Sequence, residues 1–257
     1  MKNCVMLMYG IFAYGVGLGS ILFMMGWLGN FIPKSIDSTP VSRLGEALLI
    51  NFFVFAAFGI QHSVMARPAF KAWWTKVIPE AAERSTYVLF SGVAMLLLMF
   101  SWQPLGGAIW SIDYQPARCI LHTLYFAGWG ILFGSTFALN HFDLFGLRQV
   151  WFYFHGKPYE VLQFKTPGPY RFVRHPLYVG WLMLAWATPD MTLAHLGFAV
   201  MTTAYILIAI RWEERDLVNF HGDDYIRYQA KTPMLIPSLS TRESSKQADV
   251  LSESASA

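Results

Sequence analysis

Residues 168–187, GPYRFVRHPLYVGWLMLAWA, join a polar turn to the start of a short apolar segment. The stretch carries Arg171, Arg174 and His175 together with two prolines and two tyrosines. Its apolar part, Leu177–Ala187, has about 11 residues, or roughly 17 Å of helix, whereas a spanning helix needs roughly 20 residues. The stretch therefore predicts a short or re-entrant membrane helix with polar chemistry crowded at its beginning.

The rest of the chain has the composition of an integral membrane protein. Of its 257 residues, 55% are hydrophobic and only 14% are charged, whereas soluble domains carry about 25% charged residues. Further apolar segments of near-spanning length are Val5–Leu28, Glu46–Ala66, Ser85–Trp102, Ala117–Leu139 and Met191–Arg211. Because lipid offers no partner to backbone polar groups, such segments are helical. We expect an all-α membrane protein with five to six transmembrane segments, the fifth of them short or re-entrant.

The distribution of basic residues predicts the orientation in the membrane. Only three of the 19 Lys and Arg residues, Lys34, Arg43 and Arg118, fall in the loops on one side. Basic residues accumulate on the cytoplasmic side, so we expect both termini in the cytoplasm and place the protein in a bacterial inner membrane. The net charge of +3 is explained by this topology, and we expect no nucleic-acid partner.

Composition also divides the chain into three parts. Residues 1–139 hold the N-terminal transmembrane segments. Residues 140–237 concentrate the polar chemistry in two blocks, 140–178 and 211–237, and form the expected catalytic region. Residues 238–257 are rich in Ser, Ala and charge, which predicts a disordered tail. The oligomeric state does not follow from the sequence.

The opening stretch places polar groups at a helix N-terminus. His175-Pro176 is a helix-start signal, because proline at the first helical position loses no needed hydrogen bond. His175 is then the N-cap residue, and Tyr178 lies three residues on, toward the same side. The alternative interpretation is that the basic residues are positive-inside anchors and that the aromatic residues form an interfacial belt.

The second polar block begins directly after the last apolar segment. Glu213 and Glu214 follow a fully apolar run, and acids at membrane depth are costly and usually face a cavity or a partner. We expect at least one of them to point toward the opening stretch. Tyr225 and Tyr228, three residues apart, can close an aromatic wall, although interfacial anchoring is the alternative.

A third cluster, Asn140-His141-Phe142-Asp143, follows the fourth apolar segment. Its His and Asp can form an acid–base pair. Haem or metal ligation must be considered for a chain with seven histidines, but no HxxxH or His/Cys spacing supports it. The two cysteines, Cys4 and Cys119, lie in or beside apolar runs. We therefore predict no metal site.

These motifs resemble the membrane methyltransferases related to isoprenylcysteine carboxyl methyltransferase and phospholipid methyltransferases. The shared pattern is RHPxYxG, then a Glu pair after the last span, then G-x-x-Y-x-x-Y and a closing proline, over residues 160–237. The stretches NHFDLFGLRQVW and WATPDMTLAHLGFAVMTTAYILIAIRWEERDL resemble the bacterial branch that methylates methanethiol to dimethyl sulfide.

The resemblance implies an S-adenosylmethionine pocket at the cytoplasmic membrane surface, built from the C-terminal half. The expected cofactor contacts are Tyr170, Arg174, His175, Pro176, Leu177, Tyr178, Glu213, Glu214, Tyr225 and Tyr228. Arg211 corresponds to a substrate-side arginine, and Asn140 of the NHFD cluster is expected to contact the acceptor. In chemical terms, aromatic faces can hold a sulfonium, and a glutamate can accept hydrogen bonds from ribose or amino groups.

The implied reaction also needs a thiolate, because the thiolate and not the thiol is the nucleophile. A thiol pKa of about 8.5 leaves few molecules ionised at neutral pH. Our hypothesis is that His141, oriented by Asp143, takes the proton, or that His175 does. The substrate would be a small volatile thiol that reaches the pocket from the membrane lipid.

Two other functions stay open at this point. One is a methyltransferase for a phospholipid or isoprenylcysteine acceptor, which a lipid-sized side opening would favour. The other is a non-enzymatic haem-binding or accessory membrane protein, which would show a Soret absorbance band.

Overall fold

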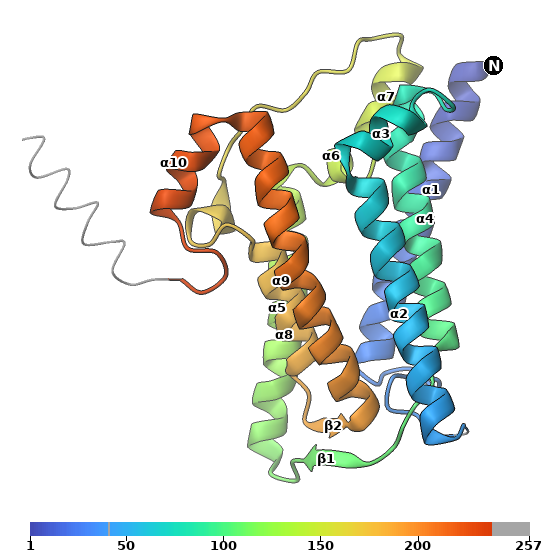
Figure 1. The fold of residues 1–257 in the computed structure, drawn as a ribbon, viewed down its shortest axis with the longest axis vertical. Helices are drawn as coiled ribbons and strands as arrows, with labels where there is room; N and C mark the ends of the chain where they lie inside the picture. Colours follow the sequence, from blue (N-terminus) through green and yellow to red (C-terminus); the bar gives the residue numbers. More distant parts are fainter. Residues whose placement is uncertain (41, 238–257) are drawn as a thin grey trace, which may run out of the picture.

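The computed structural model describes residues 1–40 and 42–237, which form a bundle of long helices with one small sheet (Figure 1). The predicted disordered tail, residues 238–257, lies outside the described residues. Five helices are long and apolar enough to cross a membrane: α1 (Lys2–Leu28), α2 (Leu44–Ala66), α4 (Glu80–Ser101), α5 (Gln115–Leu139) and α9 (Leu193–His221). The prediction of an all-α integral membrane protein is confirmed.

Shorter elements cover the two ends of the bundle. They are α3 (Pro68–Trp74), α6 (His141–Leu144), α7 (Leu147–Phe154), the 3-10 helix η1 (Gly168–Arg171), α8 (Pro176–Trp186), α10 (Asp223–Lys231), β1 (Ala108–Ser111) and β2 (Asp190–Thr192). The two strands pair antiparallel at one end, which we call the sheet end. The chain begins at the other end, which we call the N-terminal end and which also holds α3, α7 and α10 (Figure 1).

The fifth predicted apolar segment runs toward the sheet end as a short helix followed by a non-helical stretch. Its helix, α8, has 11 residues with His175 as the N-cap, so the short helix is confirmed. After Trp186 the chain makes a tight turn, in which the Thr188 N–H donates to the Trp186 carbonyl at 3.0 Å, and then enters β2, where Asp190 pairs with Arg118 in the first turn of α5 at 2.7 Å. The segment is therefore not re-entrant, because it reaches the sheet end before α9 returns.

The last long helix differs from its predicted bounds at both ends. Thr192 caps α9 by accepting a hydrogen bond from the backbone N–H of His195 at 3.2 Å. The helix then continues past Arg211 to His221. Glu213 and Glu214 therefore lie inside α9 and not in a segment that follows it.

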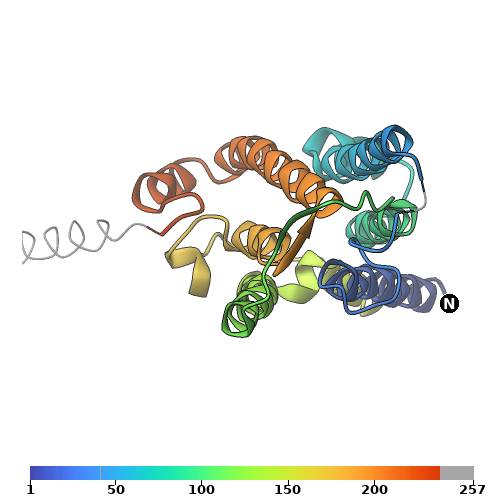
Figure 2. The same ribbon diagram turned by 90° about the horizontal axis from the view of Figure 1, so that it is seen from below.

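The helices form two groups that lie side by side (Figure 2). The first group contains α1, α2, α4 and α7, and the second contains α5, α8, α9 and α10. Within the second group α5 and α8 are very close, because a Cβ atom on Gly180 would lie 2.8 Å from the carbonyl oxygen of Gly128. Between the groups, α2 contacts α9.

An aromatic plug closes the bundle near the sheet end. Trp27 of α1, Trp102 after α4 and Phe198 of α9 make mutual edge-to-face contacts at 5.6–5.9 Å, an arrangement that aromatic quadrupoles favour. All three side chains are buried. The plug joins the two helix groups at the sheet end and leaves space between them toward the N-terminal end.

Candidate active site

The Glu214 carboxylate of α9 binds the polar residues at the start of α8. Arg174 Nε donates to Glu214 Oε1 at 2.7 Å, and His175 Nε2 lies 3.0 Å from the same oxygen. Gln229 Nε2 donates to Glu214 Oε2 at 3.0 Å. The expectation that an acid of the Glu pair points toward the opening stretch is thus confirmed for Glu214, whose two oxygens are both engaged.

The segment after α10 wraps around the same turn. Arg174 Nη1 donates to the carbonyl oxygens of Gln229 at 3.2 Å and Thr232 at 2.6 Å. The backbone N–H groups of Arg174 and His175 donate to the carbonyls of Pro233 and Met234 at 2.8 and 3.1 Å. These main-chain bonds fix the position at which α8 begins.

An aromatic group from two segments, the loop before η1 and α10, packs beside this turn. The rings of Tyr225 and Tyr228 lie 5.8 Å apart, and Phe164 lies within 5.9 Å of both. Tyr228 donates to the carbonyl oxygen of Tyr170 at 2.5 Å. Burial raises the pKa of Tyr228 to about 12, so its hydroxyl stays a donor at neutral pH. The hydroxyl of Tyr225 is buried without a hydrogen-bond partner in the described part of the chain.

The second acid of the pair faces a polar cavity. Tyr178 donates to Glu213 Oε2 at 2.7 Å, and both line a cavity of about 410 Å³ at the N-terminal end, which we call the outer cavity. Its other polar lining residues are His62, Ser63, Arg67, Lys71, Arg84, Tyr87, Tyr205 and Asp216. Burial, together with nearby Arg84, lowers the pKa of Lys71. Acidic, basic and aromatic side chains therefore line the outer cavity together.

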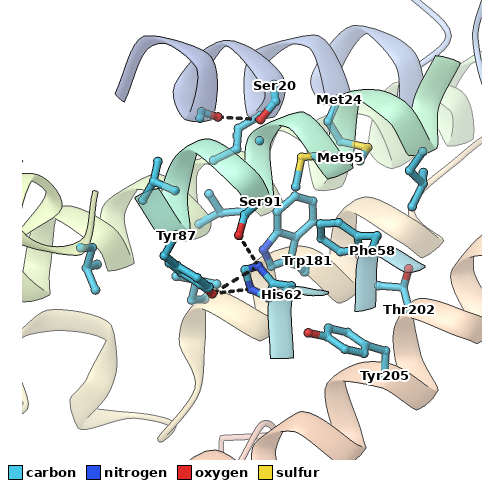
Figure 3. A pocket seen from close by; sticks show the side chains of 18 of the residues that line it. Ser20, Met24, Phe58, His62, Tyr87, Ser91, Met95, Trp181, Thr202 and Tyr205 are labelled. Carbon is cyan, nitrogen blue, oxygen red and sulfur yellow. Dashed lines mark hydrogen bonds between the residues drawn. The ribbon is translucent and has the colours of Figure 1, made fainter. Parts of the chain in front are cut away.

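A second, mainly apolar cavity of about 340 Å³ lies deeper between the two helix groups (Figure 3). Its apolar lining includes Ile21, Met24, Phe55, Phe58, Val88, Met95, Leu98, Leu132, Trp181, Phe198 and Ile206. These side chains come from α1, α2, α4, α5, α8 and α9, and Phe198 belongs to the aromatic plug. We call this space the inner cavity. The plug closes it toward the sheet end.

Five residues line both cavities, and we call them the boundary residues: His62, Arg84, Tyr87, Tyr178 and Tyr205. His62 is held by two hydroxyls, since its Nδ1 lies 3.0 Å from Ser91 Oγ and its Nε2 lies 2.9 Å from the Tyr87 hydroxyl (Figure 3). Phe58 stacks on the imidazole at 5.5 Å. Arg84 lies over the Tyr87 ring at 5.2 Å. Polar groups thus separate the two cavities.

The sequence singled out only Tyr178 among the boundary residues. The sequence offered one indication that His62 is functional: an ionisable side chain inside an apolar membrane helix marks a functional site by default. The partners of His62 come from distant parts of the chain, so no local motif contains them.

The structure does not pair His141 with Asp143. His141 Nδ1 lies 2.9 Å from Thr136 Oγ1 and its Nε2 lies 3.1 Å from the Tyr14 hydroxyl, whereas Asp143 binds Arg148 at 3.1 Å. Side chains two residues apart on a helix point to different sides, and His141 and Asp143 therefore meet different partners. Burial lowers the pKa of His141, and its ring stacks on Phe137 at 4.3 Å.

The proposed acceptor contacts also lie elsewhere. Asn140 caps α6, with Oδ1 accepting from the backbone N–H of Asp143 at 3.1 Å. Arg211 is exposed on α9. For the described residues, the linings of both cavities leave out Asn140, His141, Asp143 and Arg211. The structure therefore brings together the expected cofactor residues and separates the expected acceptor residues from them.

Comparison with known proteins places this chain among methyltransferases. Residues 160–219 match the isoprenylcysteine carboxyl methyltransferase (ICMT) family. The methanethiol S-methyltransferase of Crocosphaera subtropica is 53% identical over 232 residues, which cover 90% of this chain and 91% of that protein. The methanethiol S-methyltransferase of Mycobacterium tuberculosis is 42% identical over 238 residues, covering 92% and 98%.

More distant similarity extends to animal proteins. Nurim of Rattus norvegicus is 29% identical over 201 residues, covering 75% of this chain and 73% of that protein. No solved structure matches the chain.

Proposed function

Because the chain belongs to the methanethiol S-methyltransferase family, a branch of the isoprenylcysteine carboxyl methyltransferase family, we propose that it methylates methanethiol to dimethyl sulfide with S-adenosylmethionine as methyl donor. The protein is an integral membrane methyltransferase. The observation that carries the specific proposal is the pair of cavities, one polar and one apolar, that meet at the boundary residues.

The outer cavity and its surroundings suit the methyl donor. When bound, S-adenosylmethionine supplies an activated methyl group on a sulfonium. Glu213 offers a carboxylate that Tyr178 engages through only one oxygen, which leaves the other to accept from a hydroxyl or amino group. The hydroxyl of Tyr225, which lines neither cavity, is buried beside the turn before α8 without a partner in the described residues, so it is a second group that a ligand can satisfy. The tyrosine rings provide faces for a cation.

Other expected cofactor residues act by holding these groups in place. Glu214 is already engaged by Arg174, His175 and Gln229. We assign this cluster to positioning α8 against α9, so that Tyr178 and Glu213 stay aligned. Pro176 and Tyr170 belong to the same rigid turn, since Pro176 is buried at the start of α8.

The inner cavity suits a small apolar acceptor. Its lining includes side chains from each of the membrane-crossing helices, and Phe198 of the aromatic plug lines it toward the sheet end. A methyl thiol partitions into such a space because burial of apolar surface is favourable. An acceptor whose long tail stays in the bilayer, such as a phospholipid or isoprenylcysteine, would need an opening between helices, and the assay below distinguishes such an acceptor from the thiol.

The test is a reconstituted assay. Purified protein in nanodiscs, given S-adenosylmethionine and methanethiol, should release dimethyl sulfide, measured by gas chromatography, in equal amount to S-adenosylhomocysteine. Phosphatidylethanolamine and an isoprenylcysteine analogue should remain unmethylated. Methylation of either lipid acceptor without dimethyl sulfide would overturn the assignment, and a Soret band in the purified protein would favour the haem alternative.

A further inference from the structure

We infer that His62 of α2 accepts the thiol proton through the Ser91 hydroxyl and passes it, through Tyr87, to the outer cavity. This inference rests on the proposed function, because it assumes a thiol in the inner cavity. A thiol with a pKa of about 8.5 is mostly protonated at neutral pH, so the reaction needs a group that removes its proton.

The position of His62 is the first argument. Of the seven histidines in the chain, all of which are described, His62 is the one that lines both the inner and the outer cavity. Ser91 lines only the inner cavity, whereas Tyr87 lines both. The three side chains therefore form a continuous hydrogen-bonded path from the apolar space to the polar one.

The hydrogen bonds of the imidazole are the second argument. Ser91 Oγ lies 3.0 Å from Nδ1, and the Tyr87 hydroxyl lies 2.9 Å from Nε2 and 3.2 Å from Nδ1. A hydroxyl can donate or accept, so both partners can adapt when the ring gains or loses a proton. Phe58 stacks on the ring and fixes its plane. By contrast, His175 shares its carboxylate with Arg174, and His141 is separated from the inner cavity by Thr136 and Phe145, which line it.

The charges at the boundary favour the ionised thiol. The titratable and charged groups that face this region are Arg67 after α2, Lys71 of α3, Arg84 and Tyr87 of α4, Tyr178 of α8, and Tyr205, Glu213 and Asp216 of α9. Asp216 is paired with Arg67 at 2.8 Å, and Glu213 with Tyr178. Arg84 donates only to the carbonyl oxygen of Leu144, at 2.8 Å, among its described hydrogen bonds. Its charge therefore stabilises a thiolate nearby and disfavours a lasting imidazolium at His62, which drives the proton onward to the outer cavity.

The proton step balances as follows. The thiol S–H bond breaks and its proton binds Ser91 Oγ, while the proton that Ser91 carried binds Nδ1 of His62. The products are a thiolate and an imidazolium. The imidazolium then releases its Nε2 proton to the Tyr87 oxygen, as the Tyr87 proton passes to water in the outer cavity.

The test compares two thiols of different acidity. His62→Gln keeps hydrogen-bonding groups but cannot accept a proton. With methanethiol its kcat should fall by about 10²–10⁴-fold, the usual contribution of a general base, and should rise again with increasing pH. With 2,2,2-trifluoroethanethiol, a more acidic small thiol, the loss should be much smaller. His155→Gln, at an exposed position after α7, is the matched control and should keep wild-type rates.

The outcomes separate the two proposals. A wild-type protein that makes no dimethyl sulfide contradicts the proposed function itself. An active wild type with an equally active His62→Gln overturns only the role of His62. An equal loss with both thiols at every pH, while S-adenosylmethionine still binds by calorimetry, also overturns it, because a structural role would produce that result. If His62→Gln does not fold, Ser91→Ala is judged by the same two-thiol comparison.

Discussion

Glu213 and Glu214 are adjacent in the chain but have different surroundings. Glu214 binds Arg174, His175 and Gln229, and its side chain is only 16% exposed. Glu213 binds one tyrosine hydroxyl and faces the outer cavity. A charge that several buried groups share contributes to folding, whereas a charge that faces a cavity is available to a ligand.

The two glutamine variants should therefore differ in what they lose. Glu214→Gln leaves Arg174 without its anion in a half-buried site, and we expect a loss of about 2–3 kcal/mol in stability. Glu213→Gln should change stability by less than about 1 kcal/mol but weaken S-adenosylmethionine binding about tenfold or more. Thermal unfolding and calorimetry on both proteins check this. Equal unfolding temperatures, or unchanged cofactor affinity in Glu213→Gln, would contradict the division of roles.

Residue chemistry explains which site residues the sequence could predict. The Glu pair was recognisable because acids at membrane depth require a partner, and both do bind the opening stretch, Glu214 through Arg174 and His175 and Glu213 through Tyr178. The His141–Asp143 pair was wrong as a dyad because proximity in sequence does not put two side chains on one helix face. His62 was missed as a site residue because Tyr87 and Ser91 belong to another helix.

The contact between α5 and α8 depends on two glycines that face each other. A Cβ atom on Gly180 would lie 2.8 Å from the carbonyl oxygen of Gly128 and 3.0 Å from the backbone nitrogen of Leu132. Backbone atoms cannot rotate away as side chains do. Small residues at such positions allow membrane helices to pack closely, and here they set the depth of Tyr178 and Trp181.

Gly180→Ala should therefore push α8 away from α5. We expect a loss of about 1–3 kcal/mol in stability, typical of overpacking, together with reduced activity because Tyr178 is displaced. Gly134→Ala on α5 is the matched control, since a Cβ there meets nothing within 4 Å, and alanine favours helix by about 1 kcal/mol. Thermal unfolding and the dimethyl sulfide assay measure both variants. Unfolding temperatures that fall equally would argue against the close contact.

The lengths of the elements were only partly predictable. Helix-rise arithmetic was sufficient to identify α8 as short. It could not show that the chain continues beyond α8 to the sheet end, because that path depends on pairing between β2 and the distant β1. Hydropathy placed the end of the last span at Arg211, yet α9 continues to His221, since α10 and the turn before α8 supply partners for its polar final turns.

At the scale of the whole molecule, the two helix groups create the site between them. The inner cavity takes lining residues from α1, α2 and α4 as well as from α5, α8 and α9. Residues 160–219, which match the methyltransferase family, lie within the predicted catalytic region, 140–237. The division at residue 139 stays a prediction, but the N-terminal helices supply His62, Arg84 and Tyr87 to the boundary.

The charges at the two ends predict the orientation in the membrane. The N-terminal end holds Arg67, Lys71, Arg84 and Arg148, whereas the sheet end has Lys34, Arg43 and an Arg118 that is paired with Asp190. Positive charges favour the cytoplasmic side. The N-terminal end should therefore face the cytoplasm, and the outer cavity, which is at this end, would open where the methyl donor is synthesised.

Cysteine labelling tests this orientation with one position at each end. Both Gln163, in the loop before η1, and Asp113, between β1 and α5, are exposed. In a background with Cys4 and Cys119 replaced by serine, Asp113→Cys should react with a membrane-impermeant maleimide in intact cells. Gln163→Cys should react only after lysis, and both should react in lysed cells. The reverse pattern would place the outer cavity outside the cytoplasm, away from its cofactor supply, and would contradict the proposed function together with the orientation.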